Sequence, residues 1–177
     1  VMKDIQNDVA AYYAATAGGG DLGVHARTWL GRVQNLNDLL TKQLHDKATY
    51  LALFTPTPTT GAELINAVKY ARNVDQHLMF EVSPSEDVFI GGAHGMRTYG
   101  CWRPIPAATH AELEKRTQRL QPAYQANLEG KELTSTMLAV LRFFADIAPQ
   151  IVHRDHRGEW TGFPLKSQPA VGDPLHP

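Results

Sequence analysis

The amino-acid sequence predicts a mainly α-helical fold, an irregular bundle of about five helices with a small β-hairpin insertion. Apolar residues recur at steps of three and four over most of the chain, capping signals open several of these segments, and only residues 81–106 break the pattern. The 177 residues are 43% hydrophobic, enough to bury a substantial core. We expect one α-rich domain over residues 1–152, with 81–106 as a β-rich insertion and 153–177 as an extended tail.

Two helices are expected before residue 50. Residues 2–17 are rich in alanine and place apolar side chains at helical spacing, namely Ile5, Val9 and Tyr12 or Tyr13. Three glycines at 18–20 end this segment, and Asp21 is suited to cap a longer helix. Its apolar stripe, expected to lie in the core, consists of Trp29, Val33, Leu36, Leu40, Leu44 and Ala48.

The third helix follows a stiff linker. Thr55-Pro56-Thr57-Pro58-Thr59 cannot form a regular helix, because each proline lacks an amide hydrogen and keeps the preceding residue extended. Thr60 and Glu63 have capping-box spacing, so a helix is expected from Thr60 to about His77 or Phe80. Its core face would consist of Leu64, Val68, Ala71, Val74 and Leu78.

The remaining elements surround the β-rich insertion. Residues 86–90 and 97–102 are expected to form two β segments around a glycine-rich turn at 91–95. Thr109 and Glu112 form a second capping-box pattern, and Pro122 should kink or break the helix that follows. Pro149 closes a final helix whose buried face is expected to be Leu133, Met137, Val140, Leu141, Phe144 and Ile147.

Charge and cysteine content exclude several classes of protein. Lys and Arg total 17 against 18 Asp and Glu, so any site for a polyanion has to be a local patch. Cys101 is the only cysteine, which excludes an internal disulfide framework and multi-thiolate metal sites and favours a reducing compartment. The most apolar window, residues 136–148, is too short to cross a bilayer, and the first residues lack the order of a secretory signal. We therefore expect a cytoplasmic protein without a membrane partner.

The stretch Arg72-Asn73-Val74-Asp75-Gln76-His77 carries the strongest indication of chemistry. On a continuous helix, Arg72 and His77 would border one polar face, and the Asn73 amide would orient the His77 imidazole four residues later. Histidine titrates near neutrality and can transfer a proton, while arginine can stabilise charge that develops on a phosphate. These three residue types suffice to cleave RNA through attack by the ribose 2′-hydroxyl, without a metal.

This string resembles the ribonuclease motif of the HEPN superfamily (higher eukaryotes and prokaryotes nucleotide-binding). HEPN proteins are helical domains whose ribonuclease members carry Arg-x4-6-His, frequently with asparagine after the arginine. The resemblance covers six residues and implies a metal-independent endoribonuclease of defence or toxin type, with RNA as substrate and no cofactor. It also implies that Arg72 and His77 are catalytic, that Asn73 supports them, and that two subunits combine to make one site. The family motif usually lies late in the bundle, whereas here it lies mid-chain.

Other functions are compatible with the same residues. Arg72 could instead pair with Asp75, whose helical direction lies among the core positions, and would then be structural. The whole string could also be an ordinary solvated helix face. A non-catalytic scaffold that forms homo-oligomers is the main alternative, with a protein partner bound through the tail aromatics Trp160 and Phe163.

A third interpretation is a metal or small-ligand site built from histidines. Its metal-ligating candidates are His153, Asp155 and His156, because two histidines and a carboxylate can hold a divalent ion. The alternative for this cluster is a solvated tail without a ligand.

Overall fold

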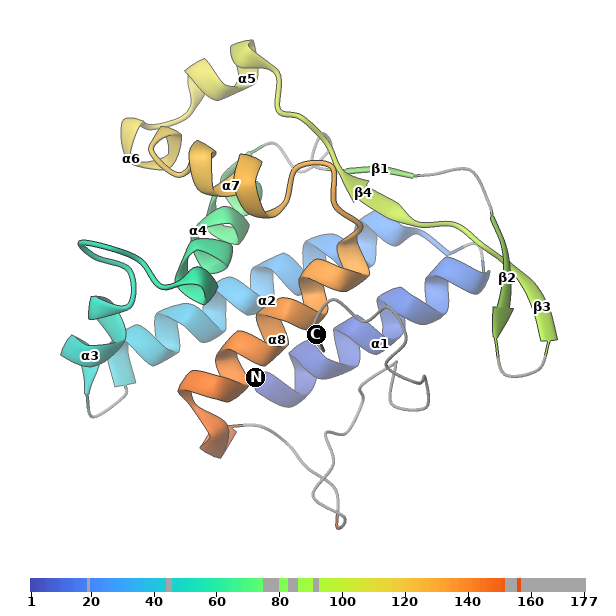
Figure 1. Ribbon diagram of the computed structural model, residues 1–177, viewed down its shortest axis with the longest axis horizontal. Helices are drawn as coiled ribbons and strands as arrows, with labels where there is room; N and C mark the ends of the chain where they lie inside the picture. The colour runs from blue at the N-terminus through green and yellow to red at the C-terminus, as the bar shows by residue number, and fades with distance from the viewer. Residues whose placement is uncertain are drawn as a thin grey trace.

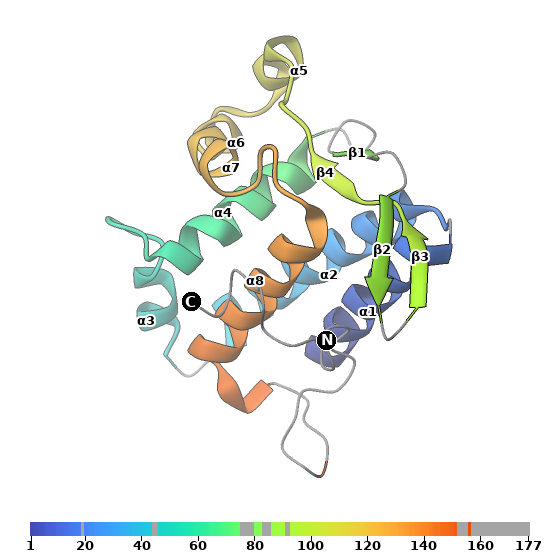
Figure 2. The ribbon, with the colours of Figure 1, turned by 45° about the vertical axis from the view of Figure 1, so that its right-hand side comes forward.

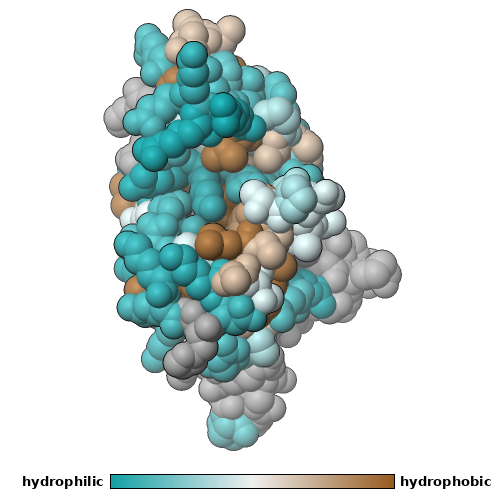
Figure 3. All heavy atoms as spheres, turned by 90° about the vertical axis from the view of Figure 1, so that its left-hand side faces the viewer, coloured by the Kyte–Doolittle hydropathy of each residue, from teal (hydrophilic) through white to brown (hydrophobic). Residues whose placement is uncertain are grey.

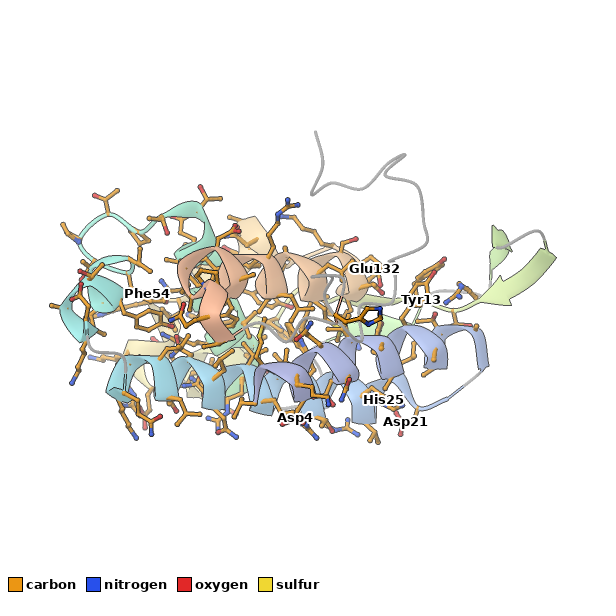
Figure 4. All side chains as sticks on the ribbon, turned by 90° about the horizontal axis from the view of Figure 1, so that it is seen from below. Asp4, Tyr13, Asp21, His25, Phe54 and Glu132 are labelled. Atoms are coloured by element: carbon orange, nitrogen blue, oxygen red, sulfur yellow. The ribbon has the colours of Figure 1, made fainter. Side chains whose placement is uncertain are left out.

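Two long antiparallel helices form one layer of the molecule, and a third long helix crosses them in a second layer (Figures 1 and 4). The computed structural model describes residues 1–18, 20–43, 46–74, 80–82, 86–90, 93–151 and 156. The first layer is α1 (Met2–Gly18) and α2 (Leu22–Gln43), and α8 (Leu133–Ile147) lies over it beside α4 (Thr60–Asn73). Their apolar faces meet in one core whose largest buried side chains include Trp29, Trp102, Tyr12, Tyr70 and Phe144.

The mainly α-helical class is confirmed, although the helices are divided more finely than the sequence predicts. Four short helices accompany the four long ones among the described residues: α3 (Lys47–Ala52), α5 (Ala107–Glu112), α6 (Lys115–Gln118) and α7 (Gln121–Asn127). A 3-10 turn, η1 (Pro149–Ile151), follows α8. Of the helices that the structure describes, none has the length and apolar character needed to span a bilayer.

The first two helices largely match the sequence prediction. The Asp21 carboxylate accepts a hydrogen bond from the Val24 amide at 3.1 Å, and Trp29, Val33, Leu36 and Leu40 are buried. The predicted stripe does not reach Ala48, which is exposed. A new helix begins there because the Asp46 carboxylate caps α3 by accepting from the Thr49 amide at 3.0 Å. Leu44 lies outside the described residues.

Helix α4 begins where expected but ends earlier. Its N-terminal cap is Thr59 instead of Thr60, and the Thr59 hydroxyl accepts from the Ala62 amide at 3.4 Å. The prediction of a helix to His77 or Phe80 is wrong, because Val74 has extended backbone angles (φ −73°, ψ 152°) and α4 ends at Asn73. The Val74 side chain is nonetheless buried, so the apolar spacing that suggested a longer helix reflects core packing.

The β-rich segment contains two antiparallel strand pairs. Strand β2 (Glu86–Ile90) pairs with β3 (Ala93–Arg97), which confirms a hairpin that begins with the predicted strand 86–90; residues 91 and 92 lie outside the described residues. The second predicted segment, 97–102, is wrong in its bounds, because β3 already begins at Ala93 inside the predicted turn; its later part is β4 (Gly100–Trp102), which pairs with β1 (Phe80–Val82) and continues the hairpin toward the core. Figure 2 shows β2 and β3 at the edge of the molecule next to α1.

Arg97 fastens this hairpin to α1. Its guanidinium is buried and donates to the Tyr13 carbonyl at 2.9 Å and to the Thr16 hydroxyl at 2.6 Å. The guanidinium carbon also lies 4.0 Å from the centroid of the Tyr13 ring. The Thr98 amide adds a bond to the Thr16 carbonyl at 2.9 Å.

Replacing Arg97 by alanine is expected to lower the free energy of unfolding by about 2–3 kcal/mol, because a buried carbonyl and hydroxyl lose a charged donor. Urea unfolding followed by circular dichroism measures this loss. The exposed Lys3→Ala variant on α1 serves as the control and should remain within about 0.5 kcal/mol of the wild type. An equal change in both variants would contradict the role given to Arg97.

The segment between β4 and α8 corrects a second capping prediction. Thr109 lies inside α5, which starts after Pro106, and Glu112 is the last residue of that helix. Pro122 lies in the first turn of α7 and therefore begins a helix instead of breaking one. Gly130 has a φ of 75°, a conformation that favours glycine, and its amide donates to the Trp102 carbonyl at 2.8 Å.

The prediction for α8 is confirmed. Glu132 caps it by accepting from the amides of Thr134 at 2.7 Å and Ser135 at 2.9 Å. Its core-facing residues Leu133, Met137, Val140, Leu141 and Phe144 are buried, and Ile147 is half-buried against the same core. The predicted tail, residues 153–177, lies outside the described residues apart from His156.

Candidate functional site

Arg72 and Asn73 occupy the last turn of α4, and both are exposed. The preceding turn is fixed in the core by Ala71 and Tyr70, which are fully buried. The two polar side chains are therefore presented to solvent from a rigid helix end. An exposed arginine on a rigid support is well suited to meet an anionic ligand.

The Asn73 side chain connects α4 to α6. Its carbonyl oxygen accepts from the Arg72 guanidinium at 3.3 Å, and its amide nitrogen donates to the Thr117 hydroxyl at 3.3 Å. Thr117 is buried between the two helices, so it holds the amide in one orientation. Asn73 thus positions the guanidinium of Arg72.

The structure does not form the continuous helix predicted for Arg72, Asn73 and His77. Because α4 ends at Asn73, Asn73 and His77 are not neighbours on one helix, and the polar face expected to connect Arg72 with His77 is absent from this helix. His77 itself lies outside the described residues, as does Asp75, the alternative partner of Arg72. Within the described part of the chain, the guanidinium of Arg72 bonds Asn73.

A histidine absent from the sequence-based site contacts α4 at Tyr70, two residues before Arg72. The Tyr70 hydroxyl and the Nδ1 atom of His110 on α5 are 2.9 Å apart, and their ring centroids are 6.0 Å apart. Burial, reinforced by the Glu129 carboxylate, raises the pKa of Tyr70, so its phenol stays protonated near neutral pH. A protonated phenol can donate to Nδ1, which places the proton of a neutral His110 ring on Nε2.

Aromatic side chains in the core pack against Tyr70 and thereby support the Tyr70–His110 pair. The ring centroids of Tyr70 and Tyr124 are 5.2 Å apart, and Trp102 meets Tyr124 edge-on at 6.5 Å. The Tyr124 hydroxyl donates to the Arg103 carbonyl at 2.6 Å. Forty residues separate Tyr70 from His110, so no local sequence pattern could have indicated the pair.

Positive charge gathers beside this end of α4. Lys115, Arg116 and Arg119 lie on or next to α6, and all three are exposed. The Asn73–Thr117 bond brings α6 against the end of α4, and Figures 1 and 2 show the two helices as neighbours. The sequence gives no sign of this patch because Arg72 and α6 are more than 40 residues apart.

The other predicted ligand cluster receives no structural test at two of its three positions. His153 and Asp155 lie outside the described residues, and His156 is exposed in a turn. Among the residues that the structure does describe, no three His, Cys, Asp or Glu side chains are grouped closely enough to hold a metal ion. Cys101, the only cysteine of the sequence, is half-buried on β4.

Comparisons of the chain with protein-family models, with curated proteins and with solved structures give no match.

Proposed function

We propose that this chain is a metal-independent endoribonuclease whose catalytic residues are Arg72, Asn73 and His77. The observation that carries the proposal is the arrangement at the end of α4, where an exposed arginine is positioned by an asparagine that Thr117 holds in place. The resemblance of the string to the HEPN ribonuclease motif adds the role of His77 and a homodimer in which two subunits complete the site.

The proposed reaction is an internal transesterification of RNA. His77 accepts the proton of the ribose 2′-hydroxyl as its oxygen attacks the adjacent phosphorus. The P–O5′ bond breaks, and the proton is returned to the departing 5′-oxygen. The products are a 2′,3′-cyclic phosphate and a 5′-hydroxyl. Arg72 stabilises the negative charge that develops on the phosphate oxygens in the transition state.

Chain connectivity supports a joint role for Arg72 and His77. Val74 is buried and fixes the point at which the chain leaves α4. His77 follows Arg72 by five residues, so covalent geometry alone limits the Cα–Cα distance between Arg72 and His77 to about 18 Å. The connection is therefore short enough for His77 to act together with Arg72 without a continuous helix.

Incubating the purified protein with single-stranded RNA in excess EDTA tests the proposal. We expect cleavage that leaves 2′,3′-cyclic phosphate ends, while DNA of the same sequence stays intact because it lacks the attacking hydroxyl. The Arg72→Lys variant keeps the charge but loses the planar, forked guanidinium, and roughly tenfold slower cleavage is expected. Absence of cleavage by the wild type over a range of RNA sequences, or activity that requires a divalent metal, would contradict the proposal.

A further inference from the structure

Four exposed cationic side chains form what we term the basic α6 surface: Arg72, Lys115, Arg116 and Arg119. Arg72 lies at the end of α4, Lys115 and Arg116 lie in α6, and Arg119 directly follows α6; the Asn73–Thr117 bond joins the two helices. Thr117 faces the interior while its charged neighbours in the sequence are exposed. One end of the molecule therefore carries clustered positive charge, although the whole chain has a net charge of −1.

Hydrogen bonds hold α6 and the turn that precedes it in a fixed conformation. The Gln118 side chain donates to the carbonyls of Leu113 at 2.8 Å and Ala111 at 3.2 Å, and thereby closes the turn between α5 and α6. The Thr117 amide bonds the Glu114 carbonyl at 2.8 Å. Cations on such a support lose less entropy on binding than cations on a loose loop.

Two carboxylates, Glu112 and Glu114, lie among these cations, and both are exposed. Glu114 is paired with Arg116, whose Nε atom lies 2.5 Å from the Glu114 carboxylate. Within the described residues, Lys115 and Arg119 have no ion-pair partner and are available to an external anion. They are consequently the two side chains most suited to contact phosphate.

We infer that the basic α6 surface binds the phosphate backbone of single-stranded RNA and leads the strand to Arg72. The inference rests on the proposed ribonuclease function. It identifies which cations hold the substrate in addition to the catalytic Arg72. Spaced, exposed cations neutralise successive phosphates and release counterions, which is the sequence-independent part of nucleic-acid binding.

The surroundings of this surface favour a nucleic-acid strand over a membrane. Figure 3 shows mostly hydrophilic side chains at the height of α6, with a few apolar side chains between them, and a larger apolar group lower down. A membrane-binding face would combine cations with apolar side chains that insert between lipids. Here apolar side chains are few at the height of α6, and the larger apolar group lies lower on this face.

The Lys115→Ala/Arg119→Ala double variant tests this inference. Binding of fluorescein-labelled single-stranded RNA, followed by anisotropy at several salt concentrations, should weaken about tenfold near 0.1 M salt, and the slope of log K against log salt should fall by about 1.4. DNA of the same sequence should show the same change, because phosphates are common to both. The matched control is Lys42→Ala/Lys47→Ala, which removes two exposed cations from α2 and α3 and should bind RNA like the wild type.

Each outcome separates this inference from the proposed function. RNA cleavage by the wild type with unchanged RNA affinity and salt slope in the Lys115/Arg119 variant would overturn the surface and leave the ribonuclease standing. Binding that depends on Lys115 and Arg119 without cleavage would support the surface and remove the ribonuclease. A wild type that binds phosphatidylserine vesicles through this surface but does not bind RNA would overturn both.

Discussion

The Trp102→Ala protein is expected to lose about 3–5 kcal/mol of unfolding free energy, the usual range for a buried tryptophan. Trp102 is 1% exposed, and its indole nitrogen donates to the Thr136 hydroxyl on α8 at 2.8 Å. Its ring meets Tyr124 of α7 edge-on. One side chain on β4 therefore joins the β-rich segment to two helices, and its loss leaves a cavity where all three meet.

Urea unfolding followed by far-ultraviolet circular dichroism measures this effect, since a change in tryptophan fluorescence would be ambiguous. Thr136→Val keeps the shape of the side chain but leaves the indole N–H buried and unsatisfied, so a loss of about 1–3 kcal/mol is expected; it also removes the bond from the Thr136 hydroxyl to the Leu133 carbonyl. Leu51→Ala, at a position 41% exposed, is the control and should cost little. A Trp102→Ala protein as stable as the Leu51→Ala protein would contradict the packing of Trp102 against α7 and α8.

The same tryptophan bears on the candidate site. Trp102 contacts Tyr124, Tyr124 contacts Tyr70, and Tyr70 bonds His110 within the turn that precedes Arg72. The aromatic residues thus form a continuous support beneath the end of α4. A Trp102→Phe protein that remains folded should consequently show altered packing at this end of the molecule.

The sequence predicts the long helices well because their cores repeat over several turns. The apolar stripe of α8 and the stripe from Trp29 to Leu40 in α2 both lie in the core. Each signal sums many residues, so single exceptions such as the half-buried Ile147 do not alter it. Periodicity of this kind depends only on local spacing, which the sequence contains.

Helix ends are predicted less well because single residues decide them. Thr59 and Thr60 are equally suitable caps by type, and only the fold shows that Thr59 bonds the Ala62 amide. Asp46 caps α3, but apolar spacing that continues to Ala48 conceals this break in the sequence. Val74 is buried in extended geometry, so its apolar character suggested helix where the chain has already left it.

Local sequence predicts the positions of Arg72 and Asn73 but not the long-range contacts around them. Arg72 and Asn73 are adjacent, and their exposure on a polar helix face is predictable from the α4 pattern. The contacts to Thr117 and from Tyr70 to His110 span 44 and 40 residues. Such contacts arise from the packing of α5, α6 and α7 on α4, which local spacing cannot specify.

The His77→Ala protein is expected to cleave RNA roughly 10²–10⁴ times more slowly than the wild type, the usual contribution of a positioned general acid–base. RNA affinity should remain near that of the wild type, because phosphate contacts on the basic α6 surface do not involve His77. The loss should therefore fall on kcat, with KM nearly unchanged. Single-turnover cleavage with excess enzyme separates the chemical step from binding.

Two other histidine variants test whether the loss of cleavage is specific to His77. His156 is exposed in a turn, so His156→Ala should cleave RNA at the wild-type rate. His110→Ala removes the partner of the Tyr70 hydroxyl, so it should lower stability while the folded protein still cleaves RNA at nearly the wild-type rate. Cleavage undiminished in His77→Ala but lost in folded His110→Ala would move the proton-transfer role to His110, because Tyr70 already holds that imidazole beside the last turn of α4.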